Sequence, residues 1–134
     1  MYLLDTNIVS ELRKTKPHGG VVSWIETVPD QDLHLSVVTL AEIQAGIEIT
    51  REQDALKAAE IEAWADQVAA TYNILPMDAT TFRLWAKLMH RQTNTVYEDA
   101  MIAATALMHK FTIATRNVRD FERFAVPLFN PFGD

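Results

Sequence analysis

The sequence predicts a single α/β domain with a short, mostly parallel central sheet flanked by helices. Its 134 residues, 49 % hydrophobic and 22 % charged, have the length and balance of one globular domain. Short β-like runs alternate with amphipathic helical runs, which favours a parallel sheet. No repeat, low-complexity segment or linker interrupts this alternation. We therefore expect one domain over residues 1–134.

The first half of the chain contains two predicted strands and four predicted helices. Leu40, Ile43 and Ile47 recur at helical spacing and indicate a helix with a core-facing stripe. The Gly19-Gly20 pair is expected to precede the second helix as a break. The expected strands are 2–4 and 32–36, and the expected helices are 7–13, 21–28, 39–49 and 51–71.

The second half continues the same alternation. Asp78 can cap a helix that carries Phe82, Trp85 and Met89 at helical spacing. A short helix is expected near Asp120. The other expected elements are strands 74–75, 111–115 and 126–129 and a helix over 97–108.

Composition excludes several classes of protein. Without cysteine the chain has neither a disulfide framework nor a thiolate metal site. The four histidines are scattered, which disfavours zinc. No apolar run has the length of a membrane span, and residues 1–5 do not read as the start of a signal peptide, so a cytoplasmic protein is expected. A net charge of −6 argues against nucleic-acid binding unless the acids cluster around a metal.

Acidic and amide side chains fall where such a cluster can form. Two of them follow the first strand directly, two follow strand 111–115, and two lie near the starts of predicted helices. In a parallel sheet all these positions belong to one edge. The six residues are Asp5, Asn7, Glu42, Asp99, Asn117 and Asp120.

Carboxylates gathered at one edge repel one another, and burial raises their pKa values further. A bound cation offsets that cost, and oxygen-only ligands suit a hard ion such as Mg²⁺ or Mn²⁺. Such an ion keeps room for a substrate phosphate, activates a water and stabilises charge in the transition state. The pattern therefore predicts metal-assisted phosphodiester chemistry.

Simpler explanations remain open for most of these residues. Asp5 and Asn7 can be helix caps or turn formers. Glu42 fits a capping box, Thr39-x-x-Glu42, which its spacing favours slightly, and Glu98 fits another, Thr95-x-x-Glu98.

Asn117 and Asp120 can be loop and cap residues. Asp99 is different, because it shares a helix face with Ile102 and Ala103 and therefore points toward apolar surroundings. A buried acid there needs a partner.

Four segments, in order, resemble the motifs of PIN domains, especially those of VapC-like toxins, and Phe129-Asn130-Pro131 is similar to the end of the FitB-like branch. The motif segments are 3–12, 36–43, 98–106 and 114–121. The resemblance spans the whole chain and implies a PIN domain over 1–134. It also implies that Asp5, Glu42 and Asp99 are the metal-site acids.

One position departs from the family pattern. Many relatives carry Asp directly after Thr-Arg, where this chain has Asn117. Asp120 can supply the missing charge, or Asn117 can orient a water without it. The expected catalytic residues are therefore Asp5, Glu42, Asp99, Asn117 and Asp120, with the metal on the first three.

The resemblance implies a Mg²⁺-dependent endoribonuclease, with Mn²⁺ as an alternative ion, acting as the toxin of a type II toxin–antitoxin module. RNA is the implied substrate, and a VapB-like antitoxin, a homodimer and operator DNA contacted through the antitoxin are the implied partners. Bases after the first helix and around the fourth motif are candidates to hold RNA phosphates. They are Arg13, Lys14, Lys16, Arg116, Arg119 and Arg123.

Several alternatives to a nuclease are disfavoured by the sequence. A haloacid-dehalogenase-type phosphatase, as another Mg²⁺-dependent phosphotransfer enzyme, needs a second Asp where Asn7 stands. A non-catalytic PIN-like binding module is disfavoured by the presence of all three acids. Four glycines at 19, 20, 46 and 133 cannot form a P-loop or a dinucleotide-binding motif.

Overall fold

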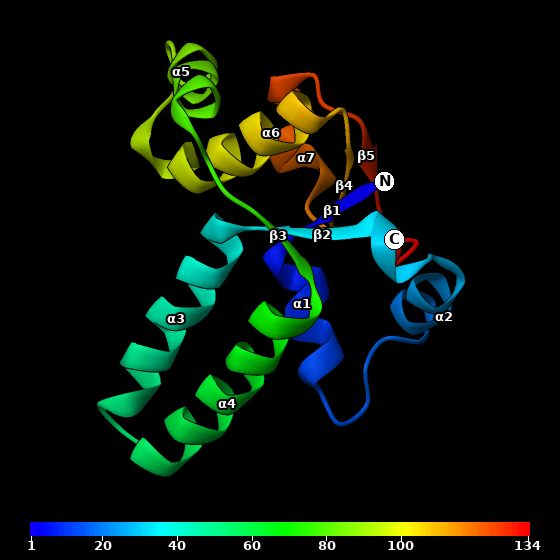
Figure 1. Ribbon diagram of the computed structural model, residues 1–134, viewed down its shortest axis with the longest axis vertical. Coiled ribbons are helices and arrows are strands. Elements are labelled where there is room, and N and C mark those ends of the chain that lie inside the picture. The colour runs from blue at the N-terminus through cyan, green and yellow to red at the C-terminus, as the bar shows by residue number, and fades with distance from the viewer.

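The computed structural model describes residues 1–134 as an α/β domain with a five-stranded sheet and seven α-helices (Figure 1). The strands are β1 Tyr2–Leu4, β2 Leu33–Ser36, β3 Asn73–Leu75, β4 Thr112–Ala114 and β5 Leu128–Phe129. The helices are α1 Thr6–Arg13, α2 Gly19–Thr27, α3 Val37–Arg51, α4 Ala55–Thr71, α5 Ala79–Leu88, α6 Tyr97–His109 and α7 Val118–Phe121. Three short 3₁₀ helices lie at Asp30–Asp32, Asn94–Val96 and Glu122–Phe124.

The sheet is parallel throughout, with the strand order β3-β2-β1-β4-β5. The first strand of the chain is therefore the central one, and the chain extends the sheet from β1 in both directions. In open parallel sheets of this kind the ligand crevice lies beyond the carboxyl ends of the strands, where the strand order reverses. That point lies between β1 and β4, because the chain adds β2 and β3 on one side of β1 and then β4 and β5 on the other.

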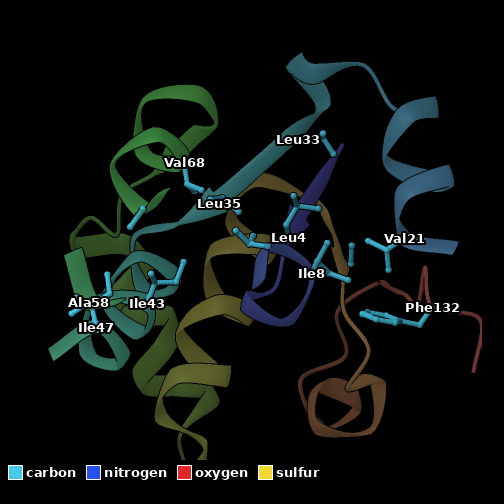
Figure 2. Packing of buried hydrophobic residues seen from close by; sticks show 13 residues of the cluster. Leu4, Ile8, Val21, Leu33, Leu35, Ile43, Ile47, Ala58, Val68 and Phe132 are labelled. Atoms are coloured by element: carbon cyan, nitrogen blue, oxygen red, sulfur yellow. The ribbon is translucent and has the colours of Figure 1, made fainter. Parts of the chain in front are cut away.

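Two hydrophobic clusters cover the two faces of the sheet, and side-chain alternation in β1 assigns one residue to each. Leu4 joins the cluster built with α1, α2, α3 and α4, whereas Leu3 joins the cluster built with α6 and α7. Figure 1 shows α5, α6 and α7 together on one side of the sheet, with α1, α3 and α4 on the other. Figure 2 shows Leu4, Ile8 and Leu35 at the centre of the first cluster, with Phe132 near Val21 at its margin.

The expected order and type of every element are confirmed, while several boundaries shift. Helix α2 includes Gly19 and Gly20, because the His18 Nδ1 accepts from the Gly20 amide and caps the helix ahead of them. The expected helix over 51–71 starts only at Ala55, where the Asp54 side chain accepts from the Lys57 amide. Asp78 caps α5 as expected, accepting from Thr81 N at 2.9 Å.

Both predicted capping boxes are wrong. Helix α3 begins two residues before Thr39, because Ser36 caps it by accepting from the Val38 amide. Thr39 is fully buried inside the helix, so Glu42 lies in the second turn and caps nothing. Helix α6 follows directly on the 3₁₀ helix Asn94–Val96, and its N-cap residue Val96 makes no side-chain cap. Thr95 and Glu98 therefore do not form a capping box. No helix in the chain is long and apolar enough to cross a bilayer.

Candidate active site at the carboxyl edge of the sheet

Asp5 is the central residue of the edge. It follows β1 directly, is only 6 % exposed and stands at the N-cap of α1. Its Oδ1 accepts from the Thr6 amide at 2.8 Å, while Oδ2 accepts from the Thr115 hydroxyl at 2.8 Å and from Asn7 Nδ2 at 3.1 Å. Three donors therefore fix the orientation of one buried carboxylate. Burial nevertheless raises its pKa, and the hydrogen bond from Thr115 is the largest opposing effect.

Asn7 and Thr115 connect Asp5 to the loop that follows β4. Asn7 Oδ1 accepts from the Arg116 amide at 3.2 Å, and Thr115 Oγ1 accepts from the Asn117 amide at 2.9 Å. The loop backbone is thus held against β1 by the same two side chains that hold the carboxylate. The first and fourth motifs of the sequence meet here, as the parallel-sheet prediction required.

Glu42 and Asp99 approach Asp5 from α3 and α6. Glu42 is exposed by surface area, yet partial desolvation, and then the charge of Asp5, raises its pKa to about 7. Burial, followed by the charges of Asp5 and Asp120, raises the pKa of the half-buried Asp99 to about 6. The mutual effects show that the three carboxylates share one electrostatic environment.

No basic side chain neutralises this group of acids. The ion pairs of the chain involve Glu11, Glu48, Glu62 and Asp134, and none includes Asp5, Glu42 or Asp99. Arg123 lowers the pKa of Asp99, but only as the smallest of the effects on it. A buried carboxylate without a cationic partner is costly, which is the condition that a bound cation relieves.

The donor set fits Mg²⁺ or Mn²⁺ in its chemistry, because it consists of oxygen atoms alone. These acids do not form a closed cage, because nowhere do three or more acidic or histidine side chains gather tightly enough to enclose an ion. Mg²⁺ retains several waters and takes only one or two protein carboxylates, so it does not need such a cage. The ligand set of Asp5, Glu42 and Asp99 stays a prediction.

Asn117 and Asp120 lie in the loop and first turn beyond β4, and both are exposed. The charge of Asp120 raises the pKa of both Asp5 and Asp99, which places it within electrostatic range of the site. The side chain of Asn117 makes no hydrogen bond that would fix it, and only its backbone is anchored. Both residues therefore lie beside the central carboxylate, Asn117 through its backbone and Asp120 through its charge.

Two buried threonines were missed by sequence reasoning. Thr115 contributes the hydroxyl that supports Asp5, and its position directly after a strand is the only signal for it. Thr39 is fully buried and its hydroxyl accepts from the Thr6 hydroxyl at 3.3 Å, joining α3 to α1 beside the site. A threonine in a parallel-sheet protein is too common to single out without its partner.

The bases after α1 and the bases around the fourth motif lie in different parts of the structure. Arg116 and Arg119 line a pocket of about 630 Å³ together with Asn117 and Asp120, next to Asp5. In contrast, Arg13 lies at the far end of α1, 5.8 Å above the Trp64 ring, and Lys14 pairs with Glu11 at 2.8 Å. The loop after β4 therefore carries two of the expected bases to the site, although Asp120, Glu122 and Asp134 line the same pocket.

The sequence of the chain is similar to those of known proteins. The PIN domain family matches residues 2–127. The chain is 35 % identical to the VapC ribonuclease Y4jK of Sinorhizobium fredii, over 98 % of each chain. It is 31 % identical to the toxin FitB of Neisseria gonorrhoeae, over the full length of both.

Solved structures give the same result. The crystal structure of FitAcB from Neisseria gonorrhoeae superposes with a TM-score of 0.87 at 30 % identity, over all of both chains. A structure of FitAB bound to an IR36 DNA fragment superposes with a TM-score of 0.75, also at 30 % identity, over 100 % of this chain and 97 % of the other. The chain therefore belongs to the PIN domain family, in the group of VapC- and FitB-like toxins of toxin–antitoxin systems.

Proposed function

We propose that this protein is a Mg²⁺-dependent endoribonuclease that hydrolyses RNA phosphodiester bonds as the toxin of a type II toxin–antitoxin module. One observation carries the proposal: the buried Asp5 carboxylate is fixed by three hydrogen-bond donors and faces Glu42 and Asp99 with no cationic partner. The family supports it, since relatives over the full length are named as VapC ribonucleases and toxins.

Asp5, Glu42 and Asp99 are the residues that would hold the ion. When bound, the ion would supply a Lewis acid for the phosphate oxygens and favour ionisation of the attacking water. The chain itself orients Asp5 through Thr115, Asn7 and the Thr6 amide, so that carboxylate needs no rearrangement to bind. The pKa of Glu42 is raised to about 7 in the metal-free protein, and binding of the ion would favour its ionised form.

Arg116 and Arg119 are the residues that would bind substrate phosphates. Arg116 and Arg119 line the pocket beside Asp120, where they would contact phosphates flanking the scissile one. These two arginines would give a chain of net charge −6 a local contact for RNA phosphates, even though three acids line the same pocket. The overall charge then limits non-specific binding, which is mainly electrostatic.

The test is cleavage of RNA by purified protein with Mg²⁺ or Mn²⁺ and with excess EDTA. We expect cleavage only with the ion, and an Asp5→Asn variant purified in parallel controls for contaminating nucleases. Cleavage that persists undiminished in EDTA contradicts the metal mechanism. Absence of cleavage by a folded wild type that still binds RNA would favour the non-catalytic PIN-like alternative.

We also propose that a VapB-like antitoxin silences the enzyme, that the pair contacts operator DNA through the antitoxin, and that the toxin is a cytoplasmic homodimer. An arginine from the antitoxin suits the site, because a guanidinium pairs bidentately with carboxylates and competes with the ion for them. An apolar pocket of about 420 Å³ between α3 and α6, lined in part by Val38, Tyr97 and Met101, adjoins Glu42 and offers hydrophobic anchorage.

Co-expression tests the antitoxin. Growth should arrest when the toxin is expressed alone and recover with the neighbouring antitoxin gene. An antitoxin that rescues equally well after its C-terminal arginines are changed to alanine would exclude inhibition through the carboxylates. Light scattering of the purified toxin tests the homodimer, and a monomer at micromolar concentration would contradict it.

A further inference from the structure

The guanidinium of Arg116 already holds an anion that belongs to the chain itself. Arg116 Nε and Nη2 donate to the same oxygen, Asp134 Oδ2, at 3.0 and 2.6 Å. Both side chains are about half exposed, so the contact forms at the open mouth of the pocket. A third donor, Asn130 Nδ2, contacts Asp134 Oδ1 at 3.0 Å. Three donors from two segments thus surround one carboxylate.

A folded C-terminal segment, residues 130–134, holds Asp134 in this position. Asn130 Nδ2 also donates to the Asp134 carbonyl at 2.9 Å, and Asn130 Oδ1 accepts from the Phe132 amide at 2.9 Å. Phe132 is buried against the core near Val21 (Figure 2). The Arg116 guanidinium lies 4.5 Å from the centre of the Phe132 ring, a stacking that fixes its plane.

This anion site is directly connected to Asp5. The Arg116 amide donates to Asn7 Oδ1, and Asn7 Nδ2 donates to Asp5 Oδ2 at 3.1 Å. Arg116, Asn130 and Asp134 also line the 630 Å³ pocket that reaches Asp120. An RNA strand with one phosphate at the carboxylates would bring a neighbouring phosphate to this pocket.

We propose that Arg116 and Asn130 form a binding subsite for an RNA phosphate next to the scissile one, and that Asp134 occupies this subsite in the free protein. The proposal rests on the proposed function. A phosphate offers the same kind of oxygen acceptor as a carboxylate, and the planar guanidinium fork binds either. RNA must then displace Asp134, so the tail weakens binding until a strand provides a competing phosphate.

Metal-free RNA binding tests the subsite separately from catalysis. A fluorescein-labelled oligouridylate is titrated with each variant in EDTA, and anisotropy gives the Kd. We expect Asp134→Asn to tighten binding about two- to fivefold, the range that an exposed, well-aligned ion pair provides. Arg116→Ala should weaken binding and reduce the dependence of log K on log salt by about 0.7, the loss of one phosphate contact. In the Arg116→Ala background, Asp134→Asn should have no effect.

Glu122→Gln is the matched control, because Glu122 lines the same pocket, carries the same charge and has no ion-pair partner. A purely long-range electrostatic effect would tighten binding equally in both variants and would overturn the inference. Asp134→Asn that binds RNA no better than wild type, or that still improves binding without Arg116, overturns it as well. Thermal melting confirms that each variant is folded.

The cleavage assay separates this inference from the proposed function. If the wild type cleaves RNA with Mg²⁺ while Asp134→Asn and Glu122→Gln behave alike in binding, only the subsite is wrong. If the wild type neither binds nor cleaves RNA, the proposed function fails and the subsite fails with it. A lower KM for Asp134→Asn with kcat unchanged supports displacement of the tail on substrate binding.

Discussion

The Thr115 hydroxyl donates to Asp5 Oδ2 at 2.8 Å, and the two residues stand directly after the adjacent parallel strands β4 and β1. The bond joins the ends of two strands that are separated by 110 positions in sequence. It is buried, so its strength does not depend on competing water. The position of the central carboxylate is therefore set by tertiary structure rather than by its own helix alone.

Removing that hydroxyl should impair catalysis. In Thr115→Val the buried Asp5 loses one of two donors to Oδ2 at almost unchanged side-chain volume, and a lost hydrogen bond to a charged group costs about 1–3 kcal/mol. We expect a lower rate of RNA cleavage and weaker Mg²⁺ binding. Thr115→Ser keeps the hydroxyl and should retain most activity. Equal activity of the valine and serine variants would contradict a positioning role.

Asp99→Asn should abolish cleavage while leaving the fold intact. The substitution removes a charge that repels Asp5 and Asp120, so the metal-free variant should melt no lower than the metal-free wild type. Its melting temperature should also lose the increase that Mg²⁺ gives the wild type. Glu98→Gln, one position earlier and exposed, is the control and should stay active. An unfolded Asp99→Asn variant would instead assign the residue a structural role.

The stability of the metal-free protein should fall as pH rises. Glu42 and Asp99 have folded-state pKa values of about 7 and about 6, above the ordinary values of 4.5 and 3.8. Between the ordinary and raised values the folded chain binds more protons than the unfolded chain, so the free energy of unfolding decreases with pH across that window. Thermal melts in EDTA from about pH 5 to about pH 8 measure the trend.

Two comparisons identify the source of the pH trend. Glu42→Gln should flatten it, since one of the three carboxyl groups with a raised pKa is removed, and saturating Mg²⁺ should oppose it by stabilising the ionised carboxylates. A melting temperature that rises steadily with pH in EDTA would contradict the raised pKa values.

Asp120 and Asn117 should matter less than Asp99. Both are exposed, whereas Asp99 is half-buried, so solvent screens the charge of Asp120 more strongly. Asp120→Ala should weaken Mg²⁺ binding modestly and lower the cleavage rate less than Asp99→Asn does. Isothermal titration with Mg²⁺ and single-turnover cleavage measure the two effects. A loss as complete as that of Asp99→Asn would show that Asp120 binds the ion directly.

Hydrophobic periodicity was sufficient to predict the order of elements and the parallel sheet. That topology in turn predicted that Asp5 and Asn117 would lie at one edge, because residues directly after parallel strands share that edge. Position on the predicted elements also placed Glu42 and Asp99 in the cluster, and the family motifs agreed on both, although spacing alone slightly favoured a capping role for Glu42. Sequence could therefore predict which acids approach one another, although not how closely they pack.

The wrong predictions of helix caps concern side chains for which the local sequence allows two different roles. Ser36 and Thr39 both have side chains that can cap a helix. Thr39 is buried against Thr6, and Ser36 is the residue that caps α3. Such burial is a tertiary effect that the local pattern does not contain. Asp134 was missed for the same reason, since its contact with Arg116 depends on Phe132 anchoring the tail in the core.

The strand order also determines when the site can form during synthesis. Asp5 emerges from the ribosome near the beginning, yet its hydroxyl donor is residue 115, in a strand that pairs with β1 only late in the chain. Contacts of such long sequence separation form after local helices and are slow to close. A nascent chain that already displays Asp5, Glu42 and Asp99 therefore lacks an ordered Asp5 until β4 is added. The topology therefore delays the ordering of Asp5 until β4 has been translated.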